Sequence, residues 1–386
     1  MDVIRCCVRL SVVASVGPFL NPMDPIAFLE ELLSIPSVST QEAALAARLA
    51  RRMAEMGLAA RVDEAGNAVG VAGAGPRQVV LLGHMDTVPG GPAVARRHGR
   101  LYGRGAVDAK GPLAAFALAA ARLVGMVPEG WQLVVIGAVE EEAATSKGAR
   151  HAAGGYAPDF CIIGEPSSWD AVTLGYKGRL LCEFRLAQPM AHTAGPGQAV
   201  AEFAVAFWNR VVAYAERRNT GREGAFDRLL PSLRQINTTV EGNSDCVGAV
   251  LGFRLPPDLA PAELESDLSA LPRHPAATLT FRGHEPTYVA DRSTPLARAF
   301  LRAIRANGGR PRFKLKTGTS DMNVVGPIWR CPILAYGPGD STLDHTPNEH
   351  VEVDEFLRAI DVLEIVLREL MAVAGCSSVA GWKVAG

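Results

Sequence analysis

Short apolar runs that each lead into acids or histidines recur along this chain and constrain its fold more than any other feature. Such runs, when turn residues bound them, are typical of buried strands. In an open α/β sheet, ligands gather at the carboxyl ends of the strands. The runs and the polar residues that follow them are 79–83 before His84 and Asp86, 133–136 before Glu140, Glu141 and Glu142, 160–164 before Glu165, and 333–336 before Asp344 and His345. The pattern predicts a sheet whose strand ends bring two histidines and several carboxylates together, as in a site for two metal ions.

One further acid, Asp108, follows a Gly-Arg-Gly segment and precedes a helix-like stretch at 113–124. A helix-cap role is one interpretation of this position. The glycines favour a second interpretation, because they let the backbone approach a bound group closely. The three acids at 140–142 leave a similar choice, between a solvated loop and a site in which packed carboxylates raise one another's pKa.

The charge balance argues against a nucleic-acid-binding protein. The chain has 386 residues with 39 basic and 40 acidic side chains, whereas such proteins carry a basic excess or a basic stripe. An apolar share of 48% is ordinary for a globular protein and supports a large core. The seven cysteines form no Cys-x-x-Cys pair, and several lie in apolar runs, so we expect buried, reduced thiols in a cytoplasmic protein.

The N-terminal segment 1–22 holds two arginines and a short apolar run, which faintly resemble a signal peptide. The run has no clear cleavage site and is too short to span a bilayer, so we expect no membrane association. Asp24 and Pro25 form a helix start with Asp24 as the N-cap. We therefore expect the folded structure to begin near Met23, with 1–22 an extension or a wrongly assigned start and 374–386 a disordered tail.

The order of the expected elements predicts one α/β domain that a smaller domain interrupts. The larger domain has alternating strands and helices in two pieces, 23–174 and 287–373, which favours a mostly parallel sheet covered by helices. Between them, 175–286 reads as β-α-β-β-α-β, the order of a split βαβ module. Its expected elements are strands at 180–186, 238–240, 249–254 and 277–281, and helices at 200–216 and 261–271.

Imidazole and carboxylate groups are ligands that zinc-like ions accept, and one carboxylate can bridge two ions. His84 and Asp86 stand two residues apart on a predicted turn, so one could bind metal while the other fixes its tautomer. A turn histidine beside a solvated acid is the alternative. No serine or cysteine nucleophile with a positioned base accompanies these motifs, which argues against covalent catalysis.

Taken together, the motifs resemble those of the M20 metallopeptidases and amidohydrolases. The matching segments are His84-Met85-Asp86-Thr87-Val88-Pro89, Gly103-Arg104-Gly105 with Asp108-Ala109-Lys110-Gly111, the triplet at 140–142, and Gly164-Glu165-Pro166. They stand in the family's order, and the likeness covers nearly all of 25–370. The resemblance implies a zinc-exopeptidase-like α/β domain, its mostly parallel sheet sandwiched by helices, with an inserted ferredoxin-like α+β lid domain that forms a homodimer. It also implies amide hydrolysis with two divalent ions, Zn²⁺ ahead of Co²⁺ or Mn²⁺.

The resemblance also implies a role for each metal-site residue. His84 and Glu165 would hold one ion, Glu142 and His345 the other, and Asp108 would bridge both. Glu141 would be the general base, and Asp86 would orient His84. Glu140 stands where the family usually has aspartate, so the choice of base and ligand depends on the register of the triplet.

Two residues of the inserted domain match family positions that face the substrate. His192, in Ala191-His192-Thr193-Ala194-Gly195-Pro196, matches a histidine that reaches the partner subunit's site and stabilises the oxyanion. Arg254 matches an arginine that holds a substrate carboxylate, with Gly252 where the family has an acid. The fork of a guanidinium group suits a carboxylate.

Segments 175–179, 316–323 and 336–340 are most similar to one branch, the LysK-type [amino-group carrier protein]-lysine/ornithine hydrolases. The resemblance implies a carrier-protein partner, with lysine or ornithine released from the side chain of its C-terminal glutamate at the end of lysine or arginine biosynthesis. The expected substrate contacts are Arg254, Lys316, Thr317 and Gly318. A cationic product needs an acid such as Asp321 or Asp340, although either acid could merely cap a turn. Lys316 or Arg179 could meet an acidic carrier tail.

Two other functions stay open. One is an N-acetylornithine or N-acetyl-lysine deacetylase, or a dipeptidase, of the same family. The other is a metal-free binding protein that keeps the fold, against which the complete set of ligand positions argues.

Overall fold

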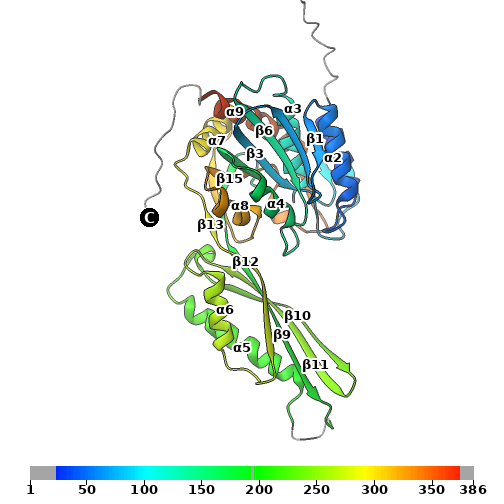
Figure 1. Ribbon diagram of the computed structural model, residues 1–386, viewed down its shortest axis with the longest axis vertical. Coiled ribbons are helices and arrows are strands. Elements are labelled where there is room, and N and C mark those ends of the chain that lie inside the picture. Colours follow the sequence, from blue (N-terminus) through cyan, green and yellow to red (C-terminus); the bar gives the residue numbers. More distant parts are fainter. Residues whose placement is uncertain (1–22, 193–194, 196, 374–386) are drawn as a thin grey trace, which may run out of the picture.

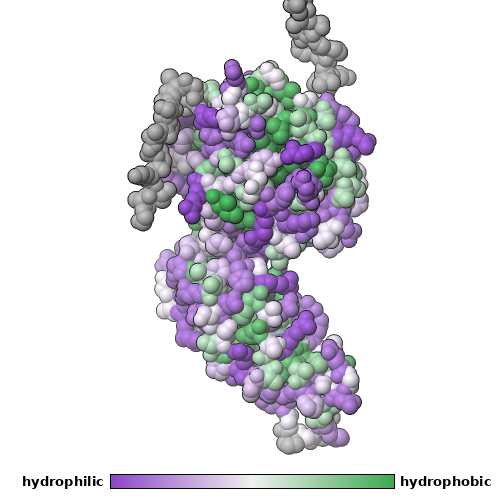
Figure 2. Space-filling view, viewed as in Figure 1, coloured by the Kyte–Doolittle hydropathy of each residue, from purple (hydrophilic) through white to green (hydrophobic). Residues whose placement is uncertain are grey.

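The chain forms a larger α/β body and a smaller, elongated body that extends from one side of it (Figure 1). The computed structural model describes residues 23–192, 195 and 197–373. The extensions expected at 1–22 and 374–386 lie outside the described residues. Hydrophilic side chains cover most of the visible face of both bodies, with small apolar groups between them (Figure 2).

The larger body is built on a nine-stranded sheet in the order β1-β2-β6-β3-β7-β15-β8-β13, with β14 also paired to β8. Its strands are β1 (Ala59–Val62), β2 (Ala68–Gly73), β3 (Arg77–His84), β6 (Trp131–Ala138), β7 (Phe160–Gly164), β8 (Ala171–Tyr176), β13 (Tyr288–Val289), β14 (Arg312–Lys316) and β15 (Ile333–Tyr336). The central strands β6, β3, β7 and β15 are parallel, whereas β1, β2, β8 and β13 join antiparallel, β8 through one residue pair with β15. This arrangement confirms the mostly parallel sheet, with antiparallel strands at its margins.

Helices cover both faces of this sheet because its central strands are apolar on both sides. Val79 and Leu81 of β3 pack into one core, and Val80 and Leu82 pack into another, as the alternation of side chains along a strand requires. The helices of the first core are α1 (Pro25–Leu33), α2 (Ala43–Glu55), α3 (Lys110–Ala121), α7 (Pro295–Ala306) and α9 (Val353–Val373), and those of the second are α4 (Lys147–Gly155) and α8 (Asp321–Trp329).

Helix α3 lies within the first core, and its alanine-rich sequence suits that position. Small side chains on every face let the helix pack closely against its surroundings, and nearly all its residues are buried. A short three-stranded sheet, β16 (His350–Glu352), β5 (Arg100–Tyr102) and β4 (Ala95–Arg97), connects the segment before α3 to the segment before α9. Both segments carry site residues.

The smaller body is a four-stranded antiparallel sheet, in the order β10-β11-β9-β12, with two helices packed on it. Its elements are β9 (Gly178–Pro189), α5 (Val200–Arg218), a short 3-10 turn (Ala225–Asp227), β10 (Leu230–Glu241), β11 (Ser244–Leu255), α6 (Pro261–Ala270) and β12 (Thr278–Glu285). The chain order is the β-α-β-β-α-β that the sequence predicts. The exact division of the chain at 175 and 286 stays a proposal.

Local signals at helix ends agree with the sequence. The carboxylate of Asp24 accepts the backbone N–H of Ile26 at 2.9 Å, so α1 begins with the predicted cap. Gly57 follows α2 with a φ of +92°, a conformation that glycine favours. In the part of the chain that the structure describes, no helix is both long and apolar enough to cross a membrane.

The four described cysteines are free thiols. Cys161 and Cys182 are buried, and Cys246 and Cys331 are partly buried. The remaining three, Cys6, Cys7 and Cys376, lie outside the described residues.

Candidate metal centre

The predicted ligands converge because the strands that carry them are neighbours in the sheet. His84 is the last residue of β3, Glu165 follows β7, and the triplet 140–142 follows β6. Since β6, β3, β7 and β15 are adjacent and parallel, their carboxyl ends meet at one edge, where the loop after β15 brings His345.

Two groups of three ligands form there and share one carboxylate. His84, Asp108 and Glu165 make the first group, and Asp108, Glu142 and His345 make the second; within each group, the ligand atoms lie within 4.8 Å of one another. The Nε2 atom of His84 is 3.0 Å from Oδ1 of Asp108, and Nε2 of His345 is 3.1 Å from its Oδ2. One oxygen of Asp108 therefore faces each group.

The helix-cap interpretation of Asp108 is wrong. Ala109 precedes α3 as its N-cap, without a side-chain cap bond, and the Asp108 carboxylate turns to the two histidines instead. Burial disfavours its charge, but the hydrogen bonds from His345 and His84 hold the pKa of Asp108 well below its usual range. The bridging position therefore keeps an ionised carboxylate.

The two histidines differ in their surroundings. Although burial disfavours its charged form, contacts with Asp108 and Asp86 raise the pKa of His84 well above its ordinary value. His345 is half-exposed, and its hydrogen bonds to Asp108 and Glu142 raise its pKa to about 10. Burial, with the nearby Asp108 charge, raises the pKa of Glu165 to about 8. A cation at the site would compete with protons for these groups.

Asp86 links the first histidine to the acidic triplet. Nδ1 of His84 lies 3.0 Å from the backbone oxygen of Asp86 and 3.6 Å from its carboxylate. The carboxylate itself accepts the backbone N–H groups of Glu141 and Glu142, at 3.0 and 2.9 Å, and the hydroxyl of Ser39 at 2.7 Å. Asp86 thus fixes the turn that presents the triplet.

The three glutamates of the triplet point in different directions. Glu140, at a φ of +60°, accepts the Thr145 hydroxyl at 2.7 Å and lies away from the ligand groups. Glu142 accepts Nε2 of His345 at 2.7 Å. Glu141 lines the neighbouring cavity, and burial raises its pKa well above the ordinary value, with Glu165 and Glu142 adding to the effect. A buried carboxylate of raised pKa is suited to proton transfer.

A cavity of about 420 Å³ opens beside the ligands and collects the expected substrate contacts. Lys316, Thr317 and Gly318 line it from the loop after β14, and Arg254 lines it from the end of β11 in the smaller body. Arg254 donates a hydrogen bond to the hydroxyl of Thr319, and Lys316 donates one to the backbone oxygen of Pro166. Both bodies therefore contribute to the wall of one cavity.

Three acids near the site could bind a cationic product, and their surroundings differ; two of them, Asp321 and Asp340, were suggested from the sequence. Asp340 is exposed and caps a turn by accepting the N–H of Thr342 at 3.0 Å, so the turn-cap alternative holds there. Asp321 is 2% exposed at the start of α8 and is not among the described residues that line the cavity. A third acid, Asp344, lines the cavity itself, and burial raises its pKa to about 8.

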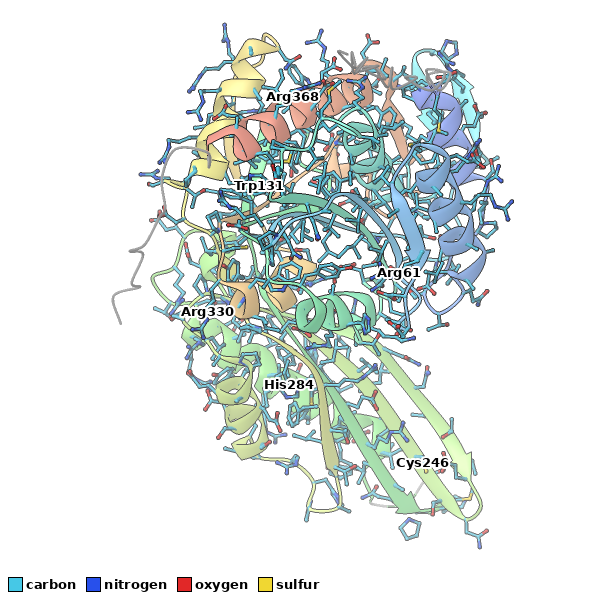
Figure 3. All side chains as sticks on the ribbon, turned by 45° about the horizontal axis from the view of Figure 1, so that its top comes forward. Arg61, Trp131, Cys246, His284, Arg330 and Arg368 are labelled. Carbon is cyan, nitrogen blue, oxygen red and sulfur yellow. The ribbon has the colours of Figure 1, made fainter. Side chains whose placement is uncertain are left out.

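His192 is not among the described residues that line this cavity. It follows β9, whose residue Ala187 pairs with Cys246 of β11. Figure 3 places Cys246 at the end of the smaller body that is far from the larger one. The structure therefore does not bring His192 to the metal ligands of its own chain.

Glu349 and Arg104 support the site and were not predicted. Oε1 of Glu349 accepts the backbone N–H groups of Gly105, Val107 and Asp108 at 2.9, 3.0 and 3.1 Å. Arg104 pairs with the same carboxylate and donates to the backbone oxygen of His345 at 3.3 Å. The sequence feature that could have pointed to Glu349 is its place four residues beyond His345, in the same segment after a strand.

The donor set fits a pair of divalent ions. Two imidazoles and three carboxylates approach two positions, and a shared carboxylate joins them, which is the ligand chemistry that such ions accept. An α/β sheet with this paired site at its strand ends defines the chain as a metal-dependent hydrolase of the dinuclear kind.

The chain belongs to the peptidase family M20/M25/M40, whose model matches residues 80–369. It is 47% identical over 347 residues to a [LysW]-lysine hydrolase of Deinococcus radiodurans, covering 89% of this chain and 96% of the relative. A putative [LysW]-lysine/[LysW]-ornithine hydrolase of Thermococcus kodakarensis is 39% identical over 353 residues, covering 91% and 93%. These findings confirm the resemblance seen in the motifs.

The fold also matches solved structures of the family. An M20 family metallo-carboxypeptidase from Sulfolobus solfataricus superposes with a TM-score of 0.74 at 18% identity, covering 91% of this chain and all of that one (100%). At this identity the likeness concerns the fold alone, and it confirms the α/β domain with an inserted smaller domain.

Proposed function

We propose that this enzyme hydrolyses the amide bond that joins lysine or ornithine to an amino-group carrier protein of the LysW type. The observation that carries the proposal is the 47% identity to a [LysW]-lysine hydrolase over 96% of that protein's length. The convergence of all five predicted metal ligands supports a working hydrolase. A deacetylase of acetylornithine or acetyl-lysine is less favoured, because the relatives above bear carrier-protein names.

In the proposed reaction, water adds to the amide carbonyl, and the bond from that carbon to the amine nitrogen breaks. When bound, a pair of divalent ions lowers the pKa of water and polarises a carbonyl group. His84, Asp108, Glu142, Glu165 and His345 would hold them, and Zn²⁺ is the first choice, with Co²⁺ or Mn²⁺ as alternatives.

Glu141 is the proposed general base. Its carboxylate takes the proton of the attacking water and then returns it to the leaving amine nitrogen, so one group serves as base and acid. Its raised pKa suits both halves of this role, because a stronger base accepts the first proton and holds it for the second transfer. Asp86 supports this role by fixing the backbone of Glu141.

Arg254 and Lys316 are the proposed substrate contacts on the cavity wall. The Arg254 guanidinium would pair with the α-carboxylate of the released amino acid, while Thr317 and Gly318 line its path. Asp344 is the acid of the cavity wall that is neither a ligand nor the base, which makes it a candidate partner for the product's ammonium group.

A homodimer through the smaller body completes the proposed site. Its support is the distance of His192 from the ligands of its own chain, since a histidine at the far end of this body could serve a second subunit. There, His192 would donate to the oxyanion that forms on the amide oxygen. A cytoplasmic location is part of the same proposal.

The deciding experiment compares two substrates under metal-loaded conditions. Lysyl-carrier conjugate and N-acetylornithine are each incubated with the enzyme, and kcat/KM is measured for both. We expect a preference for the conjugate of at least about a hundredfold, on the order of 3 kcal/mol in transition-state stabilisation. A preference for acetylornithine would establish the deacetylase instead.

A further inference from the structure

Strand β14 forms a free edge of the central sheet. It pairs in parallel with β8, and no further strand of the described chain pairs with it. An edge strand presents unpaired N–H and C=O groups, which can bind another extended segment. β14 therefore offers a place where a peptide could add to the sheet.

The backbone groups that face this free edge belong to Phe313 and Leu315. Arg312 donates its N–H to Asp170, and Lys316 accepts the N–H of Lys177, each at 3.2 Å, so both residues of β14 face β8. Because the backbone groups of successive residues point to opposite sides of a strand, those of Phe313 and Leu315 point away from β8.

The two faces of β14 differ in chemistry. Phe313 and Leu315 are 39% and 50% exposed, and with Val289, which is 48% exposed, they border a hollow of about 560 Å³. On the other face, Lys314 and Lys316 direct their amines to backbone and hydroxyl oxygens of the 166–168 segment rather than to carboxylates. The strand's own side chains are therefore apolar on one face and basic on the other, while Asp291, Arg292 and Lys314 also line the hollow.

This edge leads directly into the catalytic cavity. Leu315 borders both the hollow and the cavity, and the chain continues from β14 into Thr317 and Gly318 of the cavity wall. A peptide on the edge would therefore meet the metal ligands at the carboxyl end of β14. Only a peptide that runs parallel to β14 would bring its own C-terminal residue there.

We infer that β14 binds the C-terminal segment of the carrier protein as an added parallel strand and so delivers the scissile bond to the metal centre. The inference rests on the proposed function and adds how the macromolecular substrate is held. Side chains of the bound segment that lie beside Lys314 and Lys316 are acidic, and those beside Phe313 and Leu315 are apolar. A small-molecule substrate makes none of these contacts.

The test distinguishes binding at the β14 edge from binding in the cavity by measuring substitutions of Phe313 with a large and a small substrate. Phe313→Pro removes the outward N–H, and proline is tolerated on edge strands; Phe313→Ala keeps the N–H and is the matched control. Phe313→Pro is expected to raise KM for lysyl-carrier conjugate about tenfold, as the loss of one hydrogen bond does, with Phe313→Ala affected less. For γ-glutamyl-lysine, which lacks the rest of the carrier, kcat/KM should stay within about twofold for both variants.

A second measurement holds even if the proline variant folds poorly. Hydrogen–deuterium exchange of the peptide 312–317 is followed in metal-loaded Glu141→Gln enzyme, with and without intact conjugate. Slower exchange in the presence of conjugate supports the added strand, and unchanged exchange overturns it. An equal loss of kcat/KM on both substrates in Phe313→Pro would also overturn it. So would a change in the oligomer mass of Phe313→Pro, because β14 would then pair two copies of the chain. If the wild-type enzyme does not cleave the conjugate, the proposed function itself fails.

Discussion

Glu349 accepts the backbone N–H of Asp108 at 3.1 Å, although the two residues are 241 positions apart. The same oxygen accepts two more N–H groups of that loop, and the Glu349 side chain is fully buried. A carboxylate that fills a concave set of N–H groups fixes the path of the backbone. The position of the shared ligand thus depends on a residue from the other end of the chain.

Removal of this carboxylate should weaken both the fold and the binding of metal. In Glu349→Ala, three buried N–H groups lose their acceptor, which should lower the free energy of unfolding by about 3 kcal/mol. Loss of a group that holds a metal ligand should reduce metal affinity about 10- to 100-fold. Thermal unfolding and metal titration by calorimetry measure the two effects.

Glu352→Gln is the control for this change, because Glu352 is half-exposed and contacts Arg100 and His350 rather than the loop that carries Asp108. It should leave both quantities near the wild-type values. Full metal affinity in Glu349→Ala would mean that Asp108 keeps its place without Glu349.

The two glutamates next to each other in the triplet should behave very differently. Glu141→Gln should lower kcat about 10²- to 10⁴-fold, because the amide cannot accept the proton of the attacking water. Glu140→Gln should change kcat little, since Glu140 turns to Thr145 and away from the ligands. Both variants should bind two metal ions per chain, as elemental analysis would measure; the reverse ranking of their kcat values would move the base to Glu140.

The ligand ends of the strands were predictable because their signals are local. An apolar run followed by a turn and an acid identifies a strand end without knowledge of its neighbours, and adjacency of the parallel strands then follows from the fold class. The contacts of Glu349 carry no such signal, since Gly105 and Glu349 meet only after both halves of the chain have folded. Tertiary contacts of this kind are invisible to periodicity.

Strands that are polar or exposed were also difficult to predict. β10 spans Leu230–Glu241, but only 238–240 was expected, because most of its residues are exposed and it lacks a regular apolar alternation. The edge position of β14 depends on sheet order, which no single segment encodes. The proposed carrier-binding edge depends on that order and therefore needed the structure.

The metal-free enzyme should lose stability as the pH rises above neutrality. The pKa of His345 rises from 6.5 to about 10 in the fold, so its protonated form stabilises the protein fully below pH 6.5, and this contribution is lost as the pH rises through 10. The pKa of Glu165 rises from 4.5 to about 8 in the fold, so the folded state prefers its protonated form. Its contribution to stability is therefore also lost with rising pH, between about pH 4.5 and 8. Melting temperatures of metal-free enzyme should fall from pH 6 to 10.

Metal loading should abolish most of this fall, because a bound cation replaces the proton on each ligand. Calorimetry at pH 7 in buffers of different ionisation enthalpy should accordingly detect proton release on metal binding. His345→Ala should release fewer protons than the wild type. A pH-independent melting temperature of the metal-free enzyme would contradict the assigned ligand protonation.

Two inactive variants should restore activity when they are mixed, if His192 serves the partner subunit. His192→Ala lacks the oxyanion donor, and its kcat should fall about 10²- to 10³-fold. Glu141→Gln lacks the base. In a mixed dimer, one site would combine the intact Glu141 of the first variant with the intact His192 of the second. Subunit exchange should therefore return up to about a quarter of wild-type activity per chain, since half of the dimers are mixed and each has one complete site.

A mixture of His192→Ala with the double variant His192→Ala/Glu141→Gln is the matched control, because none of its dimers contains a complete site. Light scattering on the same samples reports whether the variants are dimers. Recovery in the first mixture alone would place His192 in the partner's site. No recovery, with mixed dimers demonstrated by mass, would mean that His192 acts in its own chain or not at all.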